Sequence, residues 1–484
     1  MSEIERKRVT RRSFLRLAGA LGLSAMASSI LGACSPQATP AAPTAASAAT
    51  EAPAATQAPA ATAVPAATEA PAASSGGTVK WAEFYIGTDA STKLNQDWIA
   101  SVVKQFEDEN PGWKVEQEEM QWDQIDEKSI IDLNAGVDHD LMYSSPQLMA
   151  KHAKTGDYID LTEYIKTLPQ SEVDDLSWSP GWKSATVNGQ QIGIATGVHT
   201  RVTAYRRDMF KDAGLDPDKP LTTFDDLVAA GKKLTKADQD LWGLAMYLGP
   251  QRGTIELYYG TLVWGLGGEY FDEKAQKATF SSEASIKAVQ WLSDVIFKDK
   301  ITPEYAYAPD GDYNTLVQTN FVQGKAAMAM GFGSYWIGAL EQAGFIKGCF
   351  PASAACAPDK AGIMPMPGPA FTNAWCLSIH KLSKHADAAW KLMQVILKPE
   401  NLKTYPDAGL PGRLSAWKTP EYSSPFYKTW LDVAQKGRGV PATPYYAEMA
   451  DTVAAALQEI LSKKADIATT LKKYEDEWNA KYAG

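Results

Sequence analysis

A tract of alanine, proline and threonine near the N-terminus limits where this chain can fold. Residues 35–77 contain 19 Ala, 7 Pro and 6 Thr without any aromatic residue, and the six-residue motif Glu51-Ala-Pro-Ala-Ala-Thr56 recurs through them in variant forms. Proline at every sixth position prevents a stable helix, and the tract has too few large apolar side chains to bury a core. We therefore expect residues 34–77 to form a disordered linker and residues 78–484 to hold the folded part.

The residues before this linker are typical of an export signal. Thr10-Arg11-Arg12-Ser13-Phe14-Leu15-Arg16 resembles the twin-arginine pattern, and a mildly apolar run, too short to span a membrane, follows it. The run ends in Leu31-Gly32-Ala33-Cys34, which resembles a bacterial lipobox. This resemblance implies that residues 1–33 are a cleaved signal peptide and that a lipid on Cys34 holds the protein at the outer face of the cytoplasmic membrane. A plain signal peptide with an accidental cysteine is the alternative.

Charge and cysteine content exclude several functions. With 57 acidic against 47 basic residues the formal net charge is −10, which argues against a nucleic-acid binder that relies on a basic face. No Cys-x-x-Cys pair is present and histidine is scarce, so we expect neither a metal site nor a cofactor. Outside the cytoplasm, Cys349 and Cys356 are expected to form a local disulfide, whereas Cys376 lies in an apolar run and is expected to be a buried thiol.

The folded part alternates strand and helix patterns. In order, the pattern predicts a strand at 79–85, a helix at 94–106, a strand at 113–119, a helix at 125–133 and a strand at 140–143. Such an order favours a parallel sheet with helices on both faces, which binds ligands beyond the carboxyl ends of its strands. Further helices are expected at 224–234, after Ser281-Ser282, after Ser383 and at 447–461. The predicted fold class is α/β, in two blocks with a helical C-terminal part.

Several longer segments carry a family resemblance when they are taken together and in order. They are Phe106-Glu-Asp-Glu-Asn-Pro-Gly-Trp-Lys-Val115, Gly156-Asp-Tyr-Ile-Asp-Leu-Thr162, Tyr205-Arg-Arg-Asp-Met-Phe-Lys-Asp-Ala-Gly214, Phe321-Val-Gln-Gly-Lys-Ala-Ala-Met328, Ile363-Met-Pro-Met-Pro367 and Gly409-Leu-Pro-Gly-Arg413. With this order and spacing, the chain resembles the extracellular solute-binding proteins of ATP-driven importers, in the sugar-binding family that includes maltose-binding protein. The resemblance covers nearly all of residues 78–484.

The resemblance implies a periplasmic-binding-protein-like fold. Two α/β lobes would be joined by a hinge of crossing strands, the first at Ala195–Thr200, with the solute held between the lobes. Carried onto this chain, lobe one would comprise residues 78–198 and 325–372, and lobe two residues 199–324 and 373–484. The implied partners are a small solute and the membrane permease of the importer, and the implied state is a monomer.

A sugar site needs two kinds of side chain. Aromatic rings cover the flat C–H faces of a sugar, and polar groups pair with its hydroxyls, because a buried unpaired polar group costs about 1–3 kcal/mol. The aromatic candidates are Tyr85, Trp122, Tyr247, Trp264, Trp336, Trp375 and Tyr445. The polar candidates are Ser144, Ser145, His199, Arg252, Asn373 and Arg413. A core position is the alternative for each aromatic residue, a hinge role for His199, and hydrogen bonds to loop carbonyls for Arg413.

The resulting prediction is a lipid-tethered receptor that captures a sugar or oligosaccharide and delivers it unchanged to a permease. The main alternative is a secreted polysaccharide-degrading enzyme that uses two carboxylates. Acidic residues are plentiful, but no spacing singles out a pair, and Gly-x-Ser-x-Gly, His-Glu-x-x-His and phosphate-loop motifs are missing. An adhesive surface lipoprotein is a third class. The sequence leaves open whether the solute is a sugar, another polyol, a sugar phosphate or a peptide.

Overall fold

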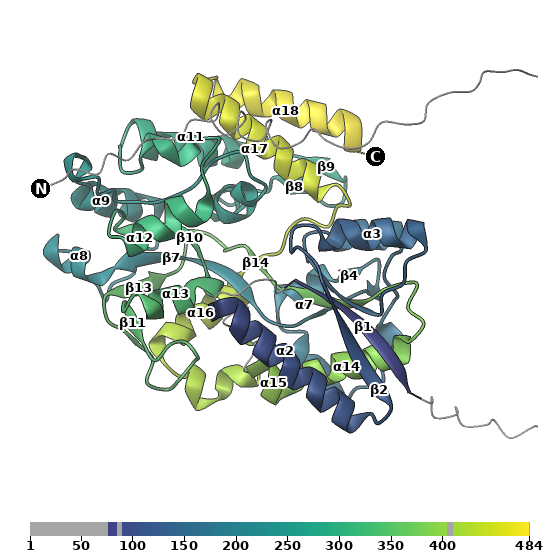
Figure 1. Ribbon diagram of the computed structural model, residues 1–484. Helices are drawn as coiled ribbons and strands as arrows, with labels where there is room; N and C mark the ends of the chain where they lie inside the picture. The colour runs from purple at the N-terminus through teal and green to yellow at the C-terminus, as the bar shows by residue number, and fades with distance from the viewer. Residues whose placement is uncertain (1–75, 85–89, 404–409, 484) are drawn as a thin grey trace, which may run out of the picture. The chain divides into compact units, whose positions relative to one another are not determined.

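The computed structural model describes residues 76–84, 90–403 and 410–483 (Figure 1). The predicted signal peptide, Cys34, residues 34–75 of the predicted linker, and Tyr85 lie outside these residues. Within the described ranges, no helix has both the length and the apolar character that a membrane crossing requires.

A five-stranded sheet with the order β2-β1-β3-β15-β6 organises one half of the folded part. Its strands are β1 (Gly77–Glu83), β2 (Trp113–Glu119), β3 (Leu141–Ser144), β6 (Ile194–Ala195) and β15 (Cys376–Ile379). β1 runs parallel to β2 and β3, and α2 (Ala90–Glu109) and α3 (Ile125–Ala135) connect the three strands in turn. The predicted β-α-β-α-β order and its parallel sense are therefore confirmed. β15 runs antiparallel to both of its neighbours.

Helix α2 packs on this half because its apolar residues recur at helical spacing. Trp98, Val102 and Phe106 lie four residues apart and are all buried. The helix ends at Glu109, and Gly112, with φ 92°, then turns the chain into β2.

A second sheet is built around β7 (His199–Arg206), which is buried along nearly its whole length. β7 pairs antiparallel with β10 (Met328–Gly333) on one side and β13 (Ala361–Met364) on the other, and its first residues pair with β14 (Thr372–Asn373). The helices of this half include α9 (Phe224–Leu234), α10 (Gly260–Gly265), α11 (Glu283–Phe297), α16 (Pro425–Lys436), α17 (Tyr446–Lys463) and α18 (Ile467–Tyr482). Figure 1 shows α11, α17 and α18 side by side, as their contacts require.

The remaining elements are short apart from α14, which has 11 residues. The helices are α4 (Met149–Thr155), α5 (Thr162–Ile165), α6 (Gln170–Leu176), α7 (Pro180–Ser184), α8 (Arg207–Asp212), α12 (Asn320–Val322), α13 (Ile337–Gln342), α14 (Ala386–Ile396) and α15 (Pro399–Lys403). The 3₁₀ and π turns are η1 (Ala237–Gln239), η2 (Ile255–Tyr259), η3 (Glu304–Tyr307), η4 (Asn314–Thr319), η5 (Ser334–Trp336), η6 (Ala416–Lys418) and η7 (Pro420–Tyr422). Three two-stranded ribbons are β4 (Thr186–Val187) with β5 (Gln190–Gln191), β8 (Phe271–Asp272) with β9 (Lys277–Ala278), and β11 (Ile346–Lys347) with β12 (Ala357–Pro358).

Two separate hydrophobic cores divide the folded part. The first contains buried residues from 79–195 and 374–402, and we call these segments lobe one. The second contains buried residues from 198–370 and 410–478, and we call these segments lobe two. The chain thus changes core between Ala195 and Val198, changes back between Ala370 and Ala374, and changes once more between Leu402 and Leu410.

The predicted assignment of the later segments does not agree with the strand pairing. Residues 325–372 were expected in lobe one, but β10 and β13 pair with β7 in lobe two. Residues 374–402 were expected in lobe two, but β15 pairs with β3 and α14 packs on α2 in lobe one. The sequence motifs give the order of the segments along the chain. The strand with which each segment pairs is determined by contacts between residues that lie far apart in sequence.

The structure pairs Cys349 and Cys356 in a disulfide that closes a short loop in lobe two. Cys376 is a free thiol at the start of β15, fully buried, and burial raises its pKa. Its thiol is therefore protonated and shielded from solvent in the folded protein.

Candidate functional site

Two segments of lobe two and the strand β14, which pairs with β7, bring aromatic and polar side chains together beside the crossings between the lobes. The side chains belong to His199 and Arg201 at the start of β7, Tyr335 and Trp336 in η5, and Asn373 in β14, and we call them the junction cluster. Asn373 pairs with His199 in the strand register. The ring of Tyr335 lies 6.1 Å from that of His199 and 5.9 Å from that of Trp336. The predicted residues His199, Trp336 and Asn373 therefore belong to one group.

Arg201 is the charged centre of this cluster. Its side chain is only 8% exposed, and its guanidinium lies 5.3 Å from the ring centre of Tyr335 and 5.9 Å from that of Phe371. One Nη donates to the carbonyl oxygen of Thr200 at 3.4 Å, but Nε has no acceptor among the described residues. A buried guanidinium is expected to have all its donors engaged, so this donor is available to another polar group.

Other buried polar atoms near the junction also lack a partner in the described part of the chain. They are Nε1 of Trp336, which can donate, and Oδ1 of Asn373 and Oε1 of Gln147, which can accept. More than nine in ten buried polar groups in folded proteins are paired. Unpaired donors and acceptors beside aromatic faces therefore offer positions to a polar molecule that also has apolar surface.

A carboxylate from η2 lies close to this cluster. Glu256 accepts hydrogen bonds from the hydroxyl of Tyr446 at 3.2 Å and from Nε2 of Gln147 at 3.4 Å. Burial raises the pKa of Glu256, although the charge of Arg201 and these two hydrogen bonds act in the opposite direction. Because Gln147 lies in lobe one and Glu256 in lobe two, this contact joins the lobes next to the cluster.

A second contact between the lobes involves a predicted residue. Nζ of Lys154, at the end of α4, donates to the hydroxyl of Tyr445 at 2.7 Å and lies 4.4 Å from the centre of its ring. Tyr445 also packs on Tyr482 of α18, with 4.9 Å between the ring centres. Tyr445 thus lies between the lobes, while its neighbour Tyr446 points to Glu256.

Lobe one contributes aromatic rings close to the crossing. Trp375 is partly exposed, and its ring lies 4.5 Å from that of Phe84, which in turn lies 5.2 Å from that of Tyr143. The backbone oxygen of Trp375 accepts from the amide of Thr196 at 3.0 Å, so Trp375 is held where the chain first passes between the cores. Trp375 follows Asn373 by two residues, in the segment between β14 and β15.

Several predicted residues lie in other surroundings, with their polar groups already engaged. Ser144 is fully buried and shares a hydrogen bond with Ser378, at 2.8 Å. Tyr247 is 1% exposed, and its hydroxyl donates to the carbonyl oxygen of Gly311 at 2.9 Å. Trp264 is a core residue that donates from Nε1 to Glu269 at 3.1 Å. These three side chains are held within their lobes.

The two predicted arginines both form ion pairs. Arg252 binds Asp451 through two nitrogens, at 2.9 and 3.1 Å, on an exposed surface of lobe two. Arg413 is 4% exposed, donates to the carbonyl oxygen of Leu397 at 2.5 Å, and pairs with Asp175 and Glu172 at 3.3 and 3.2 Å. Arg413 is thus bound to lobe one by a carbonyl and two carboxylates.

The last two described candidates belong to lobe one. The amide of Ser145 donates to Oδ1 of Asp126 at 2.9 Å, an atom that His152 also contacts. Trp122 is 63% exposed, in the turn between β2 and α3. No described contact brings either residue to the junction cluster.

The sequence prediction missed Arg201, Glu256, Tyr335 and Gln147. A signal was present for two of them. Tyr335 adjoins the predicted Trp336, and Arg201 is the charged residue inside the otherwise uncharged run from His199 to Tyr205, where burial of the whole strand makes a charge unusual. Glu256 and Gln147 become recognisable only when the lobes come together.

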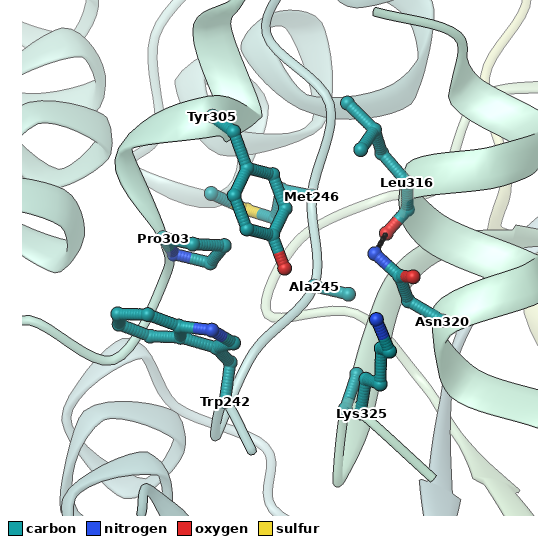
Figure 2. A pocket seen from close by; sticks show the side chains of 9 residues that line it. Trp242, Ala245, Met246, Pro303, Tyr305, Leu316, Asn320 and Lys325 are labelled. Atoms are coloured by element: carbon teal, nitrogen blue, oxygen red, sulfur yellow. Dashed lines mark hydrogen bonds between the residues drawn. The ribbon is translucent and has the colours of Figure 1, made fainter. Parts of the chain in front are cut away.

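A separate depression lies in lobe two and contains none of these residues (Figure 2). Trp242, Pro303 and Tyr305 line one side of it, and Asn320 and Lys325 the other. It leaves essentially no enclosed space even for a molecule the size of water, so it is a shallow surface depression and not a ligand pocket. Among the described residues, no three His, Cys, Asp or Glu side chains are grouped to hold a metal ion.

Comparisons with known proteins agree with this architecture. The family model described as "Bacterial extracellular solute-binding protein" matches residues 89–403. A relative from Sinorhizobium fredii, described as a probable amino-acid ABC transporter periplasmic-binding protein, is 26% identical over 340 residues, which are 69% of this chain and 73% of that protein.

Two solved structures are similar at the level of the fold. A solute-binding protein from Thermotoga lettingae, bound with α-D-tagatose, aligns with a TM-score of 0.69 at 21% identity and covers 84% of this chain and 99% of that one. The maltose-bound MalE3 protein of T. maritima aligns with a TM-score of 0.66 at 20% identity, covering 83% of this chain and 99% of that one. The two-lobed α/β fold predicted from the sequence is confirmed.

Proposed function

This chain belongs to the bacterial extracellular solute-binding protein family, and from that premise we propose that it captures a carbohydrate between its lobes and delivers it to the permease of an ATP-driven importer. The junction cluster carries the proposal. It places the rings of Tyr335 and Trp336 beside the unpaired donor of Arg201 and the unpaired acceptor of Asn373. Aromatic faces with unpaired polar atoms are complementary to the C–H faces and hydroxyls of a sugar.

The proposed mechanism is closure of the two lobes on the solute. The chain passes between the cores at 195–198, at 370–374 and between Leu402 and Leu410, and the first two segments act as the hinge. The contacts of Gln147 with Glu256 and of Lys154 with Tyr445 form only when the lobes are together. A solute shifts the balance toward this closed form only by binding it more tightly than the open form. Micromolar affinity, about −8 kcal/mol, needs no covalent step.

A free amino acid is the second candidate solute. One relative is described as a probable amino-acid transporter component, and Arg201 and Glu256 provide opposite charges for a carboxylate and an ammonium group. The aromatic rings of the junction cluster favour a carbohydrate as the solute. A free amino acid could be bound by the two charged side chains alone, and the rings would then have no role in binding.

A thermal-shift screen tests the proposal directly. The purified protein would be melted with neutral mono- and oligosaccharides, sugar acids and amino acids, since a solute bound only by the folded state raises its apparent stability. We expect a neutral sugar to raise the melting temperature and to be recovered intact. New reducing ends after incubation with oligosaccharides would instead favour the polysaccharide-degrading alternative.

We also propose that the protein acts as a monomer, anchored by a lipid on Cys34 and held off the membrane by residues 34–77. Replacing Cys34→Ala is expected to move the protein from the membrane fraction to the soluble exported fraction on fractionation and immunoblotting. Continued membrane attachment of the variant would count against the lipid anchor.

A further inference from the structure

The disulfide of lobe two closes a loop that packs directly against α13. The loop comprises residues 348–356, between β11 and β12, and we call it the disulfide loop. The amides of its first two residues donate to the carboxylate of Glu341 in α13, at 2.8 and 2.9 Å. The ring of Phe350 lies against Gly338 of the same helix, where an added Cβ would be 3.1 Å from two ring atoms. The loop therefore holds α13 through a carboxylate and through a close apolar contact.

The disulfide loop is itself held at the residue that binds Glu341. Cys349 is cross-linked to Cys356, and its carbonyl oxygen accepts from the hydroxyl of Tyr427 in α16. Within the loop, Oγ of Ser353 donates to the carbonyl oxygen of Gly348 at 2.7 Å. A cross-link restricts the conformations that a loop can adopt. Opening the disulfide would therefore loosen the two amides that bind α13.

Helix α13 begins at the residue directly after Trp336, so the position of the helix affects this side chain. The indole N–H of Trp336 has no partner among the described residues, and its ring packs on those of Phe332 and Tyr335, at 6.2 and 5.9 Å between centres. At the other end of η5, Oγ of Ser334 donates to the carbonyl oxygen of Val198 at 3.3 Å. The turn is thus bound to the crossing at its first residue, while its last residue depends on α13.

We propose that Glu341 and the disulfide loop are positioning groups for solute binding, because they hold α13 so that the ring of Trp336 keeps one position in the junction cluster. This inference rests on the proposed function only for the role of Trp336, since the position of its ring can be measured without solute. A loop that only stabilised lobe two would change the melting temperature and leave the surroundings of this ring unaltered.

Fluorine NMR of protein labelled with 5-fluorotryptophan measures those surroundings. The resonance of Trp336 is assigned by its loss in Trp336→Phe, and that of Trp264, a core residue of the same lobe, by its loss in Trp264→Phe. The Trp264 resonance reports on lobe two away from α13.

The variants remove the contacts of the loop in two independent ways. Glu341→Ala removes the acceptor of both amides, and Cys349→Ala/Cys356→Ala removes the cross-link. The matched control is Glu475→Ala, because this carboxylate accepts from the amide and the hydroxyl of Ser281, at 2.7 and 2.8 Å, elsewhere in lobe two. Melting curves verify that each variant is folded.

We expect the Trp336 resonance to broaden about twofold or to split in Glu341→Ala and in the disulfide variant, as the ring samples more than one position. The Trp264 resonance, and both resonances in Glu475→Ala, should stay as in wild type. Glu341→Gln keeps one acceptor oxygen and should show a smaller change. An unaltered Trp336 resonance would overturn the proposal, and so would an equal change at Trp264, which would indicate loosening of the whole lobe. If the disulfide variant is unfolded, the two Glu341 variants decide between these outcomes.

Titration of the same samples with maltose, a neutral disaccharide, separates this inference from the proposed function. In wild type the Trp336 resonance should shift as maltose binds, and the dissociation constant should rise about fivefold in Glu341→Ala, by roughly 1 kcal/mol. Unchanged affinity in variants whose Trp336 resonance has changed would overturn the binding role of the loop. If maltose moves no resonance in wild type, the result counts against the proposed function, while the solute-free spectra still decide whether the loop positions Trp336.

Discussion

At the level of single residues, the type of a side chain does not predict whether it lies in a core or near the crossings between the lobes. The tryptophans illustrate this point. Trp264 lies in the core of lobe two with its indole N–H engaged, whereas Trp336 is partly exposed and its indole N–H has no partner among the described residues. Nothing in the adjoining sequence separates these two cases, because burial is decided by segments far away in the chain.

The first prediction concerns Trp336. Replacing Trp336→Ala should weaken solute binding tenfold or more, since an aromatic face and a hydrogen-bond donor are lost together. Titration calorimetry with the bound neutral sugar measures the effect, and melting without solute should change little because the side chain is partly exposed. Tyr305→Ala, which removes an exposed ring from the depression of Figure 2, is the control. An unchanged dissociation constant for Trp336→Ala would remove this residue from the site.

A buried histidine in lobe one predicts a dependence of stability on pH. His152 is fully buried and contacts Asp126 at 2.9 Å and Asp157 at 2.7 Å. Burial alone would lower the pKa of His152, but its hydrogen bonds to the two carboxylates raise it to about 9. A folded-state pKa above the unfolded value of about 6.5 contributes stability that is complete below pH 6.5 and is lost as the pH rises through 9.

Urea denaturation at pH 6, 7.5 and 9 measures this effect. The free energy of unfolding should fall across that range by roughly 3 kcal/mol at most, from a shift of about 2.5 units. His152→Gln should be less stable at pH 6 and should show a shallower fall. Some slope should remain, because two carboxylates also raise the pKa of His139 against the effect of its burial. An equal slope in the variant would show that His152 is not the group that titrates.

At the level of elements, local signals located helices well, whereas strand partners escaped prediction. Helix α9 has the predicted bounds because Thr223 accepts from the amide of Asp226 and fixes the first turn. The helix expected after Ser383 begins at Ala386. Helix α18 was not predicted, since few of its residues are buried and its apolar periodicity is weak. The pairing of β7 with β10 and β13 joins residues more than a hundred positions apart, which no local pattern encodes.

The connection between α6 and the segment after residue 410 provides a prediction at this scale. Asp175 accepts from Nη1 of Arg413 and from both the amide and the hydroxyl of Ser415, at 3.3, 2.6 and 2.7 Å. Asp175→Asn should lower the free energy of unfolding by about 2–4 kcal/mol, because it leaves a 4%-exposed arginine with fewer acceptors. Asp174→Asn, an exposed neighbour that contacts Gln170, is the matched control and should change stability by less than about 0.5 kcal/mol.

The same variant tests the role of Arg413. If this arginine is structural, solute affinity in Asp175→Asn stays within threefold of wild type while urea denaturation shows the loss. A large loss of affinity without loss of stability would return Arg413 to the binding site, as the sequence had suggested.

At the level of the whole molecule, the sequence predicted two lobes and the first crossing but assigned later segments to the wrong side. The order of the segments along the chain limits the number of crossings between the lobes. The positions of these crossings depend on which hydrophobic core each segment joins. β15 belongs to lobe one because it pairs with β3 on one side and β6 on the other. Trp375 directly precedes β15 and therefore lies at the crossing. The proposed site involves both lobes, because Gln147 in lobe one contacts Glu256 in lobe two, and no pattern within the sequence of either lobe predicts this contact.

The last prediction concerns the closed form. In the structure Nζ of Lys154 in lobe one donates to the hydroxyl of Tyr445 in lobe two at 2.7 Å, and moving the lobes apart would break this bond. Tyr445→Phe should therefore leave the solute-free protein unchanged but weaken solute binding about three- to tenfold, because a hydrogen bond from a charged donor at a partly exposed position contributes about 1 kcal/mol. The loss should appear as faster solute release in stopped-flow measurements, since the contact forms after the encounter. Tyr474→Phe, which removes a hydroxyl bonded to Glu459 within lobe two, controls for the chemical change. Equal release rates for Tyr445→Phe and wild type would show that closure does not depend on this contact.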